Sequence, residues 1–136
     1  MKTSKQLQVG DSATFEKVIT DAVVRLFAEV SGDNNPVHLD EDYAANTIFK
    51  KRIAHGGLIS SLFSTILGTT LPGEGTIYLE QNSRFVKPVY LNDTITAKVE
   101  VESIDEVKNR VLLKTTAYNQ KGEPVVVGHA LVMPPR

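Results

Sequence analysis

The hydrophobic pattern of this chain changes once, between Leu71 and Thr76, and that change limits the possible folds more than any other feature. Before it, residues 58–71 carry paired apolar side chains at helical spacing, and the residues between them are small. This pattern predicts a helix with a broad apolar stripe. Because small residues make even its other side easy to cover, we expect it to be the most deeply buried helix of the protein.

Beyond the change, apolar residues recur at every second position. Residues 94–102 alternate cleanly between apolar and polar side chains, and two further strands follow at 111–118 and 125–133. Clean alternation is typical of antiparallel strands with one face on the core and one towards water. Since the helices come early and the strands late, we expect an α+β fold: a curved antiparallel sheet lying against one buried helix.

The chain before the long helix is less regular. Residues 13–18 read as a short strand, and residues 21–30 have the spacing of an amphipathic helix with Thr20 as its N-cap and Gly32 beyond its end. A second, short helix is predicted to start at Asp40 and to fade near residue 49. We find no repeat and no linker, so residues 1–136 are assigned to one domain.

Composition excludes several kinds of protein. Fifteen basic and sixteen acidic side chains give a formal charge of −1 and no basic stripe, so nucleic acid is not an expected partner. No cysteine is present, which removes disulfides and thiolate chemistry. The first ten residues lack the apolar run of a signal peptide, and no segment has the length of a membrane span. We therefore expect a soluble, cytoplasmic protein without membrane contacts.

The stretch from Ser31 to His38 reads S-G-D-N-N-P-V-H and places a carboxylate, Asp33, five positions from an imidazole, His38. Asn34 tolerates left-handed backbone angles, and the residue before Pro36 is pushed towards extended geometry. The chain should therefore bend so that both side chains reach one small volume, where they could hold a water and exchange a proton with it. The alternative is that Asp33 only caps a helix end or stabilises the turn, while His38 packs nearby.

The long helix follows His55-Gly56-Gly57 directly. Glycines at a helix start leave backbone N–H groups open, and the helix dipole adds positive potential, so this end could receive a developing oxyanion. Close packing or a turn with positive φ would explain the glycines equally well. We expect His55 to form a local hydrogen bond at the helix start, and His129 to be a satisfied structural histidine.

Lys50-Lys51-Arg52 is the densest positive cluster of the chain. It is read either as a solvated surface turn or as a contact for an anionic ligand group such as a phosphate.

The segment Phe27 to Asp40 resembles the hydratase motif of the MaoC-like, (R)-specific enoyl-CoA hydratases, and the resemblance continues through Ala54 to Ser64, Leu71-Pro72-Gly73 and Arg84-Phe85. It covers nearly the whole chain and implies the hot-dog fold. It also implies reversible hydration of trans-2-enoyl-CoA to (R)-3-hydroxyacyl-CoA, and a homodimer with joined sheets. The coenzyme A thioester is then a substrate, and no metal or redox cofactor is expected.

The resemblance also implies roles by position. Asp33 and His38 would be the catalytic pair, Gly56 would offer its N–H to the thioester carbonyl, Ser64 would support the site by hydrogen bonding, and Asn35 would stabilise the catalytic turn. Leu67 is expected in the core, where it could also line the acyl chain, and the cluster of Lys50, Lys51 and Arg52 could contact the phosphates of coenzyme A.

Three alternatives stay open at this point. A hot-dog thioesterase would use the same fold and the same acyl-CoA but would direct water at the carbonyl carbon. A dehydratase would act on acyl groups carried by a carrier protein. A non-catalytic module would only bind acyl-CoA.

Overall fold

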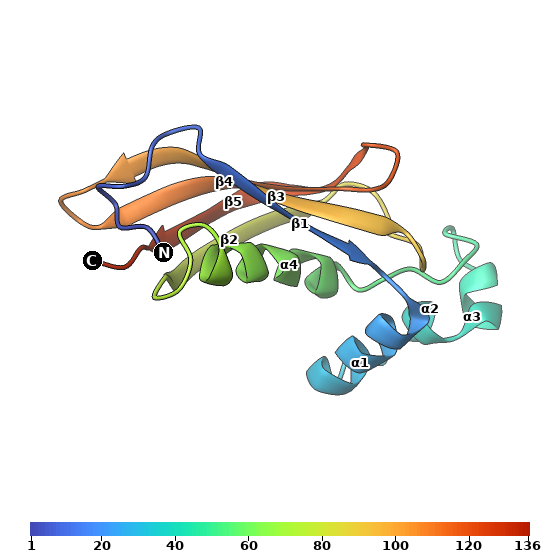
Figure 1. The fold of residues 1–136 in the computed structure, drawn as a ribbon. Coiled ribbons are helices and arrows are strands. Elements are labelled where there is room, and N and C mark those ends of the chain that lie inside the picture. The colour runs from blue at the N-terminus through green and yellow to red at the C-terminus, as the bar shows by residue number, and fades with distance from the viewer.

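One antiparallel sheet dominates the computed structural model, which describes residues 1–136. Its five strands lie in the order β1-β3-β4-β5-β2 (Figure 1). Their bounds are β1 (Ser12–Val18), β2 (Ile77–Phe85), β3 (Thr94–Asp105), β4 (Arg110–Tyr118) and β5 (Pro124–Met133). The strand assignments after Thr76 are confirmed, and so is the α+β class.

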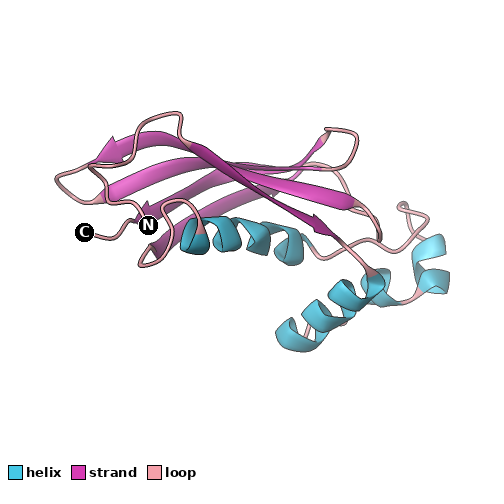
Figure 2. Ribbon diagram, in the orientation of Figure 1, coloured by secondary structure: helices cyan, strands magenta, loops and turns pink.

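Four helices precede β2 in the chain, and their bounds are α1 (Asp21–Ser31), α2 (Pro36–Leu39), α3 (Glu41–Ala45) and α4 (Gly56–Thr69). Helix α4 lies along one face of the sheet, while α1, α2 and α3 are grouped beyond the end of that layer, on the side of the α4 N-terminus (Figure 2). This arrangement brings the turn between α1 and α2 close to the start of α4, although the two are more than twenty residues apart in sequence.

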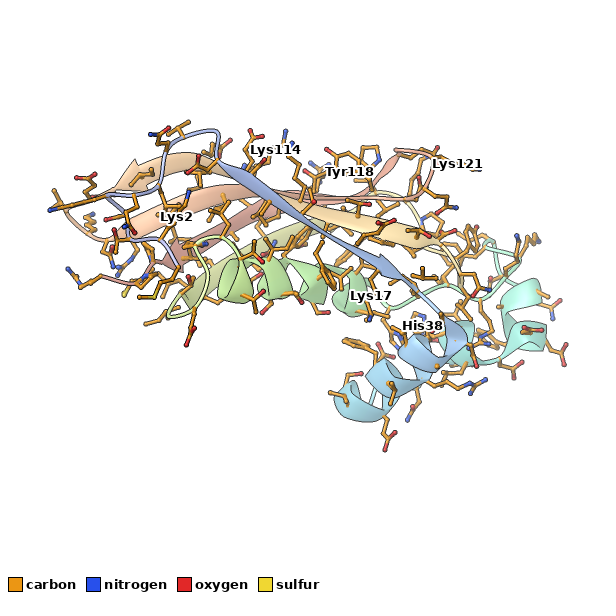
Figure 3. All side chains as sticks on the ribbon, viewed as in Figure 1. Lys2, Lys17, His38, Lys114, Tyr118 and Lys121 are labelled. Carbon is orange, nitrogen blue, oxygen red and sulfur yellow. The ribbon has the colours of Figure 1, made fainter.

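The hydrophobic core forms between α4 and the inner face of the sheet. The alternation in β3 is confirmed, because Ile95, Ala97, Val99 and Val101 are all buried while the residues between them are only partly covered. Helix α4 contributes six buried side chains: Leu58, Ile59, Leu62, Phe63, Ile66 and Leu67. Polar side chains such as Lys114 and Tyr118 stand on the opposite face of the sheet (Figure 3).

Helix α4 differs from the expectation in two respects. It starts at Gly56 rather than after Gly57, and it is buried on one side only. The small residues Ser61, Ser64 and Gly68 form an exposed side, because nothing in the chain packs against them. It is the helix with the most buried side chains, as expected, but the small residues on its other side are left uncovered in the single chain.

Two local predictions are also corrected. Helix α3 ends at Ala45, before Phe49, and Pro36–Leu39 forms a short helix that the pattern did not predict. His129 has a polar partner, as expected, because its Nε2 lies 3.2 Å from a carboxylate oxygen of Glu102, but its ring is exposed on the outer face of β5. None of the helices combines the length and the apolar character that crossing a membrane requires.

Candidate active site

The turn between α1 and α2 is built by local hydrogen bonds. Helix α1 ends at Gly32, whose left-handed backbone (φ 78°) lets its N–H donate to the carbonyl of Ala28. The carboxylate of Asp33 accepts from the N–H of Asn35 at 3.2 Å. The side chain of Asn35 in turn accepts from the N–H of Val37 at 3.3 Å and caps α2, which has proline in its first turn. The expected bend is therefore present, and Asn35 stabilises it.

His38 lies on α2 and is buried. Its Nδ1 is 2.8 Å from the carbonyl oxygen of Ile53. A carbonyl only accepts, so Nδ1 carries the proton and Nε2 keeps a free lone pair. Burial lowers the pKa of His38 below its ordinary value, the Ile53 carbonyl raises it, His55 lowers it further, and the Asp33 carboxylate raises it, with a net decrease. The ring is therefore a neutral acceptor near neutral pH.

His55 is the third member of the site, and the expectation of a local hydrogen bond is wrong. Its ring is only 2% exposed, and Nε2 donates to the main-chain carbonyl of Asp33, 2.9 Å away and 22 positions back in the chain. Its ring stacks on that of His38 with centroids 3.9 Å apart, and Phe27 covers it at 4.9 Å. Its Nδ1 is buried without a partner.

The structure brings Asp33 and His38 together. A carboxylate oxygen of Asp33, a ring nitrogen of His38 and a ring nitrogen of His55 lie within 4.8 Å of one another. Asp33 is exposed to solvent. Carboxylate and imidazole groups are also metal ligands. However, two rings inclined by only 29° direct their in-plane lone pairs along nearly parallel planes, which does not suit one shared cation.

Gly56 opens α4 beside this pair. The N-cap residue of the helix, His55, forms no side-chain cap, so the first N–H groups are left for a ligand. His38 and Gly56 both line a mostly apolar cavity of about 610 Å³, together with Gly57, Ile59, Phe85 and Val126 among others. A methyl group on Gly56 would lie 2.8 Å from Cε1 of Phe85, so close packing also requires glycine here.

A model of the MaoC-like domain family matches residues 4–122, which is most of the chain. The chain belongs to the MaoC-like domain family. Among its MaoC-like relatives is an (R)-specific enoyl-CoA hydratase of Rhodospirillum rubrum, 44% identical over 96% of this chain and 90% of the relative.

Two solved structures extend the similarity of this MaoC-like chain to the whole fold. The (R)-hydratase from Aeromonas caviae superimposes with a TM-score of 0.94 and 44% identity, covering 96% of this chain and 99% of that one. The R-hydratase from Pseudomonas aeruginosa superimposes with a TM-score of 0.93 and 48% identity, covering 98% of this chain and 86% of that one. Together with the antiparallel sheet on α4, these matches confirm the hot-dog fold.

Two of the residues expected at the site of this MaoC-like chain lie further along α4. At 1.5 Å per residue, Ser64 is about 12 Å and Leu67 about 16 Å from Gly56 along the helix axis. Ser64 is exposed and forms no side-chain hydrogen bond, and Leu67 is buried in the core. Neither lines the cavity that contains His38. Their expected roles therefore stay predictions.

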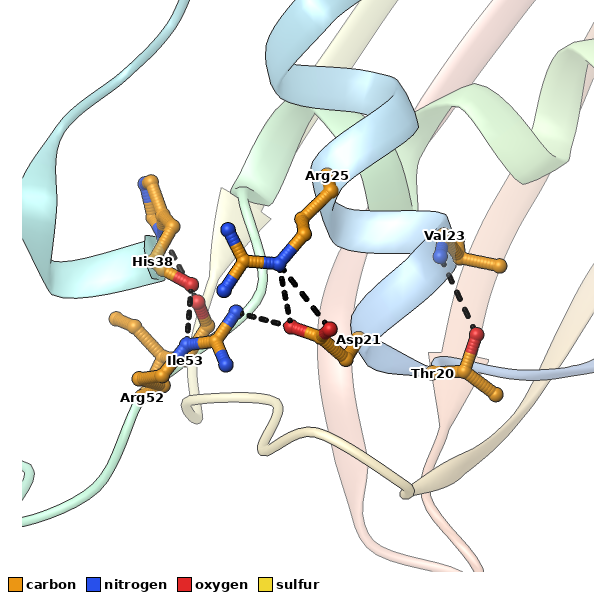
Figure 4. Close-up of polar contacts among 7 residues, drawn as sticks. All are labelled: Thr20, Asp21, Val23, Arg25, His38, Arg52 and Ile53. Atoms are coloured by element: carbon orange, nitrogen blue, oxygen red, sulfur yellow. Dashed lines mark hydrogen bonds and ion pairs between the residues drawn. The ribbon is translucent and has the colours of Figure 1, made fainter. Parts of the chain in front are cut away.

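The positive cluster divides into two parts. Lys50 and Lys51 are exposed and line a surface depression with Tyr90, over whose ring the Lys51 ammonium lies at 5.4 Å from the centroid. Arg52 also lines this depression, but it is buried and therefore does not belong to a solvated surface turn. Its guanidinium donates to a carboxylate oxygen of Asp21 and to the carbonyl of His38 (Figure 4). The expected contact of Arg52 with a phosphate therefore stays a prediction.

Two residues at the site were not predicted there. The pattern predicts for His55 a local hydrogen bond, with a catalytic role as the alternative, and for Phe85 only a place in a strand. Phe85 reaches Gly56 through the packing of β2 against α4, whereas His55 precedes Gly56 directly in the chain and reaches the turn at Asp33 through a long-range hydrogen bond.

Proposed function

We propose that this protein is an (R)-specific enoyl-CoA hydratase, which adds water reversibly to trans-2-enoyl-CoA and forms (R)-3-hydroxyacyl-CoA. The observation that carries the proposal is that the carboxylate of Asp33 lies close to the ring of His38, and that His38 lines a cavity together with Gly56. Relatives named as (R)-specific enoyl-CoA hydratases support it over nearly the full chain.

In the proposed reaction, a water is held between the carboxylate of Asp33 and the free Nε2 of His38. The pair takes one proton from this water while its oxygen forms a bond to C3 of the enoyl group. The π electrons of the C2–C3 double bond move into the thioester and give an enolate. The pair then returns a proton to C2 on the same face. Each acid–base step of this kind contributes about 10²–10⁴-fold.

The enolate oxygen needs a fixed donor during this step. The N–H of Gly56 points from the uncapped start of α4, where the helix dipole also favours negative charge. Removing one such donor typically costs about 2.7–4 kcal/mol in the transition state. The proton transfers and this donor account for the whole reaction, so we propose that it uses no metal and no redox cofactor, with coenzyme A entering only as part of the substrate.

The remaining site residues are assigned by their position. Lys50 and Lys51 are free to contact the phosphates of coenzyme A, since both are exposed in the depression beside Tyr90. Ser64 is proposed to support the site by hydrogen bonding, and Leu67 to border the acyl chain. Substitution of Lys50 and Lys51 by glutamine should raise KM for enoyl-CoA and leave kcat unchanged.

We also propose a homodimer with joined sheets. Strand β2 is an edge strand that presents large apolar side chains to solvent: Ile77 is 53% and Phe85 57% exposed. Unpaired edges of this kind are templates for pairing with a second copy. Light scattering after gel filtration should give twice the chain mass, and a stable monomer would contradict the dimer. A cytoplasmic location is part of the same proposal.

Crotonyl-CoA tests the proposed reaction. The purified protein should remove the enoyl absorbance and yield 3-hydroxybutyryl-CoA of R configuration, without release of free thiol. Thiol release without loss of the enoyl group would assign the protein to thioesterases. A large preference for the same acyl group on a carrier protein would assign it to carrier-protein dehydratases instead.

A further inference from the structure

Arg52 is the only buried arginine of the chain, and it connects three segments. Arg52 is 8% exposed. Its Nη2 donates to Oδ1 of Asp21 at 2.6 Å, and its Nε donates to the main-chain carbonyl of His38 at 2.7 Å (Figure 4). Asp21 is the first residue of α1, His38 lies on α2, and Arg52 itself precedes α4. The guanidinium therefore lies where α1, α2 and the approach to α4 meet.

We propose that Arg52 is a positioning residue for His38, and that Asp21 holds Arg52 in place. This inference rests on the proposed function, since it assigns His38 to the water-activating pair.

The geometry ties His38 at two points to two consecutive residues. Its carbonyl accepts from Arg52, and its Nδ1 donates to the carbonyl of Ile53 at 2.8 Å. A third bond runs from the N–H of Ile53 to the carbonyl of Val37 at 3.3 Å. Hydrogen bonds thus hold both the backbone and the ring of His38 to the segment Arg52-Ile53. Three residues further along the chain, this segment reaches Gly56. This arrangement fixes the separation between the imidazole and the N–H proposed to hold the enolate.

A guanidinium suits this task for a chemical reason. It stays charged at any pH that a protein tolerates, and its planar fork can donate to two acceptors at once. A buried cation also needs a partner of opposite charge. The carboxylate of Asp21 supplies it, and the hydrogen bond from Arg52 is the first cause of the lowered pKa of that carboxyl group. Lysine would keep the charge but could not reproduce both directions of the fork.

Arg25 provides a matched control within the same cluster. Its Nε donates to both oxygens of Asp21 at 3.1 Å, one helical turn along α1. It is exposed, and it does not contact His38 (Figure 4). Arg25→Gln therefore removes a cation from the same carboxylate without removing a bond to the histidine.

The test compares Arg52→Gln, Arg52→Lys, Asp21→Asn and Arg25→Gln by steady-state hydration of crotonyl-CoA, by its pH profile and by thermal unfolding. Displacing a catalytic group by about 1 Å costs about 10²-fold. We expect both Arg52 variants to lose about 10–100-fold in kcat with little change in KM. We expect Asp21→Asn to lose less and Arg25→Gln to retain wild-type kcat. A decrease in kcat in Arg52→Lys cannot come from removal of the positive charge, because lysine keeps it.

The pH profile separates positioning from mere stability. A loosened His38 is better hydrated, so in Arg52→Gln the acidic limb of kcat/KM should move to higher pH, while Arg25→Gln leaves it in place. Folded Arg52 variants with wild-type kcat and an unmoved acidic limb would overturn the proposal. So would equal losses in Arg52→Lys and Arg25→Gln.

Titration of the His38 ring by NMR tests the same contact without substrate. In Arg52→Lys the Nδ1 proton of His38 should exchange faster and the pKa of the ring should rise; unchanged values would overturn the inference. If Arg52→Gln does not fold, this titration and Asp21→Asn decide the outcome. If the wild-type protein does not hydrate enoyl-CoA, the proposed function fails, while the ring titration still reports on Arg52 by itself.

Discussion

The rings of His38 and His55 stack with their centroids 3.9 Å apart, and each ring donates its proton to a main-chain carbonyl of a different segment. His38 donates to Ile53, and His55 donates to Asp33. The two imidazoles therefore fasten the turn that carries Asp33 to the segment that leads into α4, and the tautomer of each ring is set by its carbonyl partner.

Replacement of either member of the proposed catalytic pair, Asp33 or His38, should abolish most of the activity. Asp33→Asn retains an acceptor for the N–H of Asn35, so the turn persists while the base is lost. We expect Asp33→Asn and His38→Ala each to lower kcat by about 10²–10⁴-fold, and the double variant to lose little more than the worse single one, because the two groups act as a unit.

Asp105→Asn and His129→Ala are the controls for these variants, since both residues lie away from the cavity. They should keep wild-type kcat. Asp33 and His38 variants with wild-type kcat would favour a protein that binds acyl-CoA without reacting with it.

Gly56→Ala should impair the site through Phe85. The new methyl group would lie 2.8 Å from Cε1 of the ring, so either Phe85 or the start of α4 has to move. The main-chain N–H is still present, and the loss of about 10-fold or more in kcat/KM therefore measures displacement of that donor. A second change, Phe85→Leu, should restore part of the activity.

Gly68→Ala is the matched control on the same helix. A methyl group there meets nothing within 4 Å, and alanine should stabilise an exposed helical position by about 0.4–1 kcal/mol. Its kcat/KM should equal that of the wild type. Equal losses in both glycine variants would show that contact with Phe85 is not the cause.

His55→Ala should lower both stability and activity. The substitution removes the donor to the Asp33 carbonyl and the stacking partner of His38. We expect a decrease of about 1–3 kcal/mol in the free energy of unfolding and about 10-fold or more in kcat. Urea denaturation and initial rates measure the two effects. His129→Ala, which removes only an exposed contact with Glu102, should change neither, and an equally active His55→Ala would contradict the assignment.

The pH dependence follows from the lowered pKa of His38, for which burial is the main cause. The neutral ring is the active form, so kcat/KM should stay high as pH falls to 6.5, the ordinary value for histidine, and should decline only below it. An acidic limb centred above 6.5 would contradict this assignment.

Stability should depend on pH in the same direction. Below 6.5 the unfolded chain binds a proton at this position more readily than the folded chain does, so folding loses stability as pH falls through this window and regains it as pH rises. Urea unfolding of wild-type protein and of His38→Ala should show a steeper loss in the wild type.

Much of the fold was predictable because its signals are local. The alternation of Ile95 to Val101 depends only on which side of a strand faces the core, and it appears directly in the burial of these residues. The cap at Thr20 and the left-handed Gly32 also join atoms only a few positions apart. For the same reason, the bend that unites Asp33 and His38 could be predicted from the residues between them.

Only the tertiary structure decided the position of residues whose partners lie far away in the sequence. Arg52 belongs to a run of basic residues that favours solvent, yet it is buried, and its guanidinium donates to Asp21, which lies 31 positions away. His55 finds its acceptor 22 positions away. The sequence by itself determined the fold class and the reactive turn, because short-range geometry and hydrophobic period suffice for them. Packing decided which side chains hold the turn in place, because a contact between distant segments produces no regular spacing in the sequence.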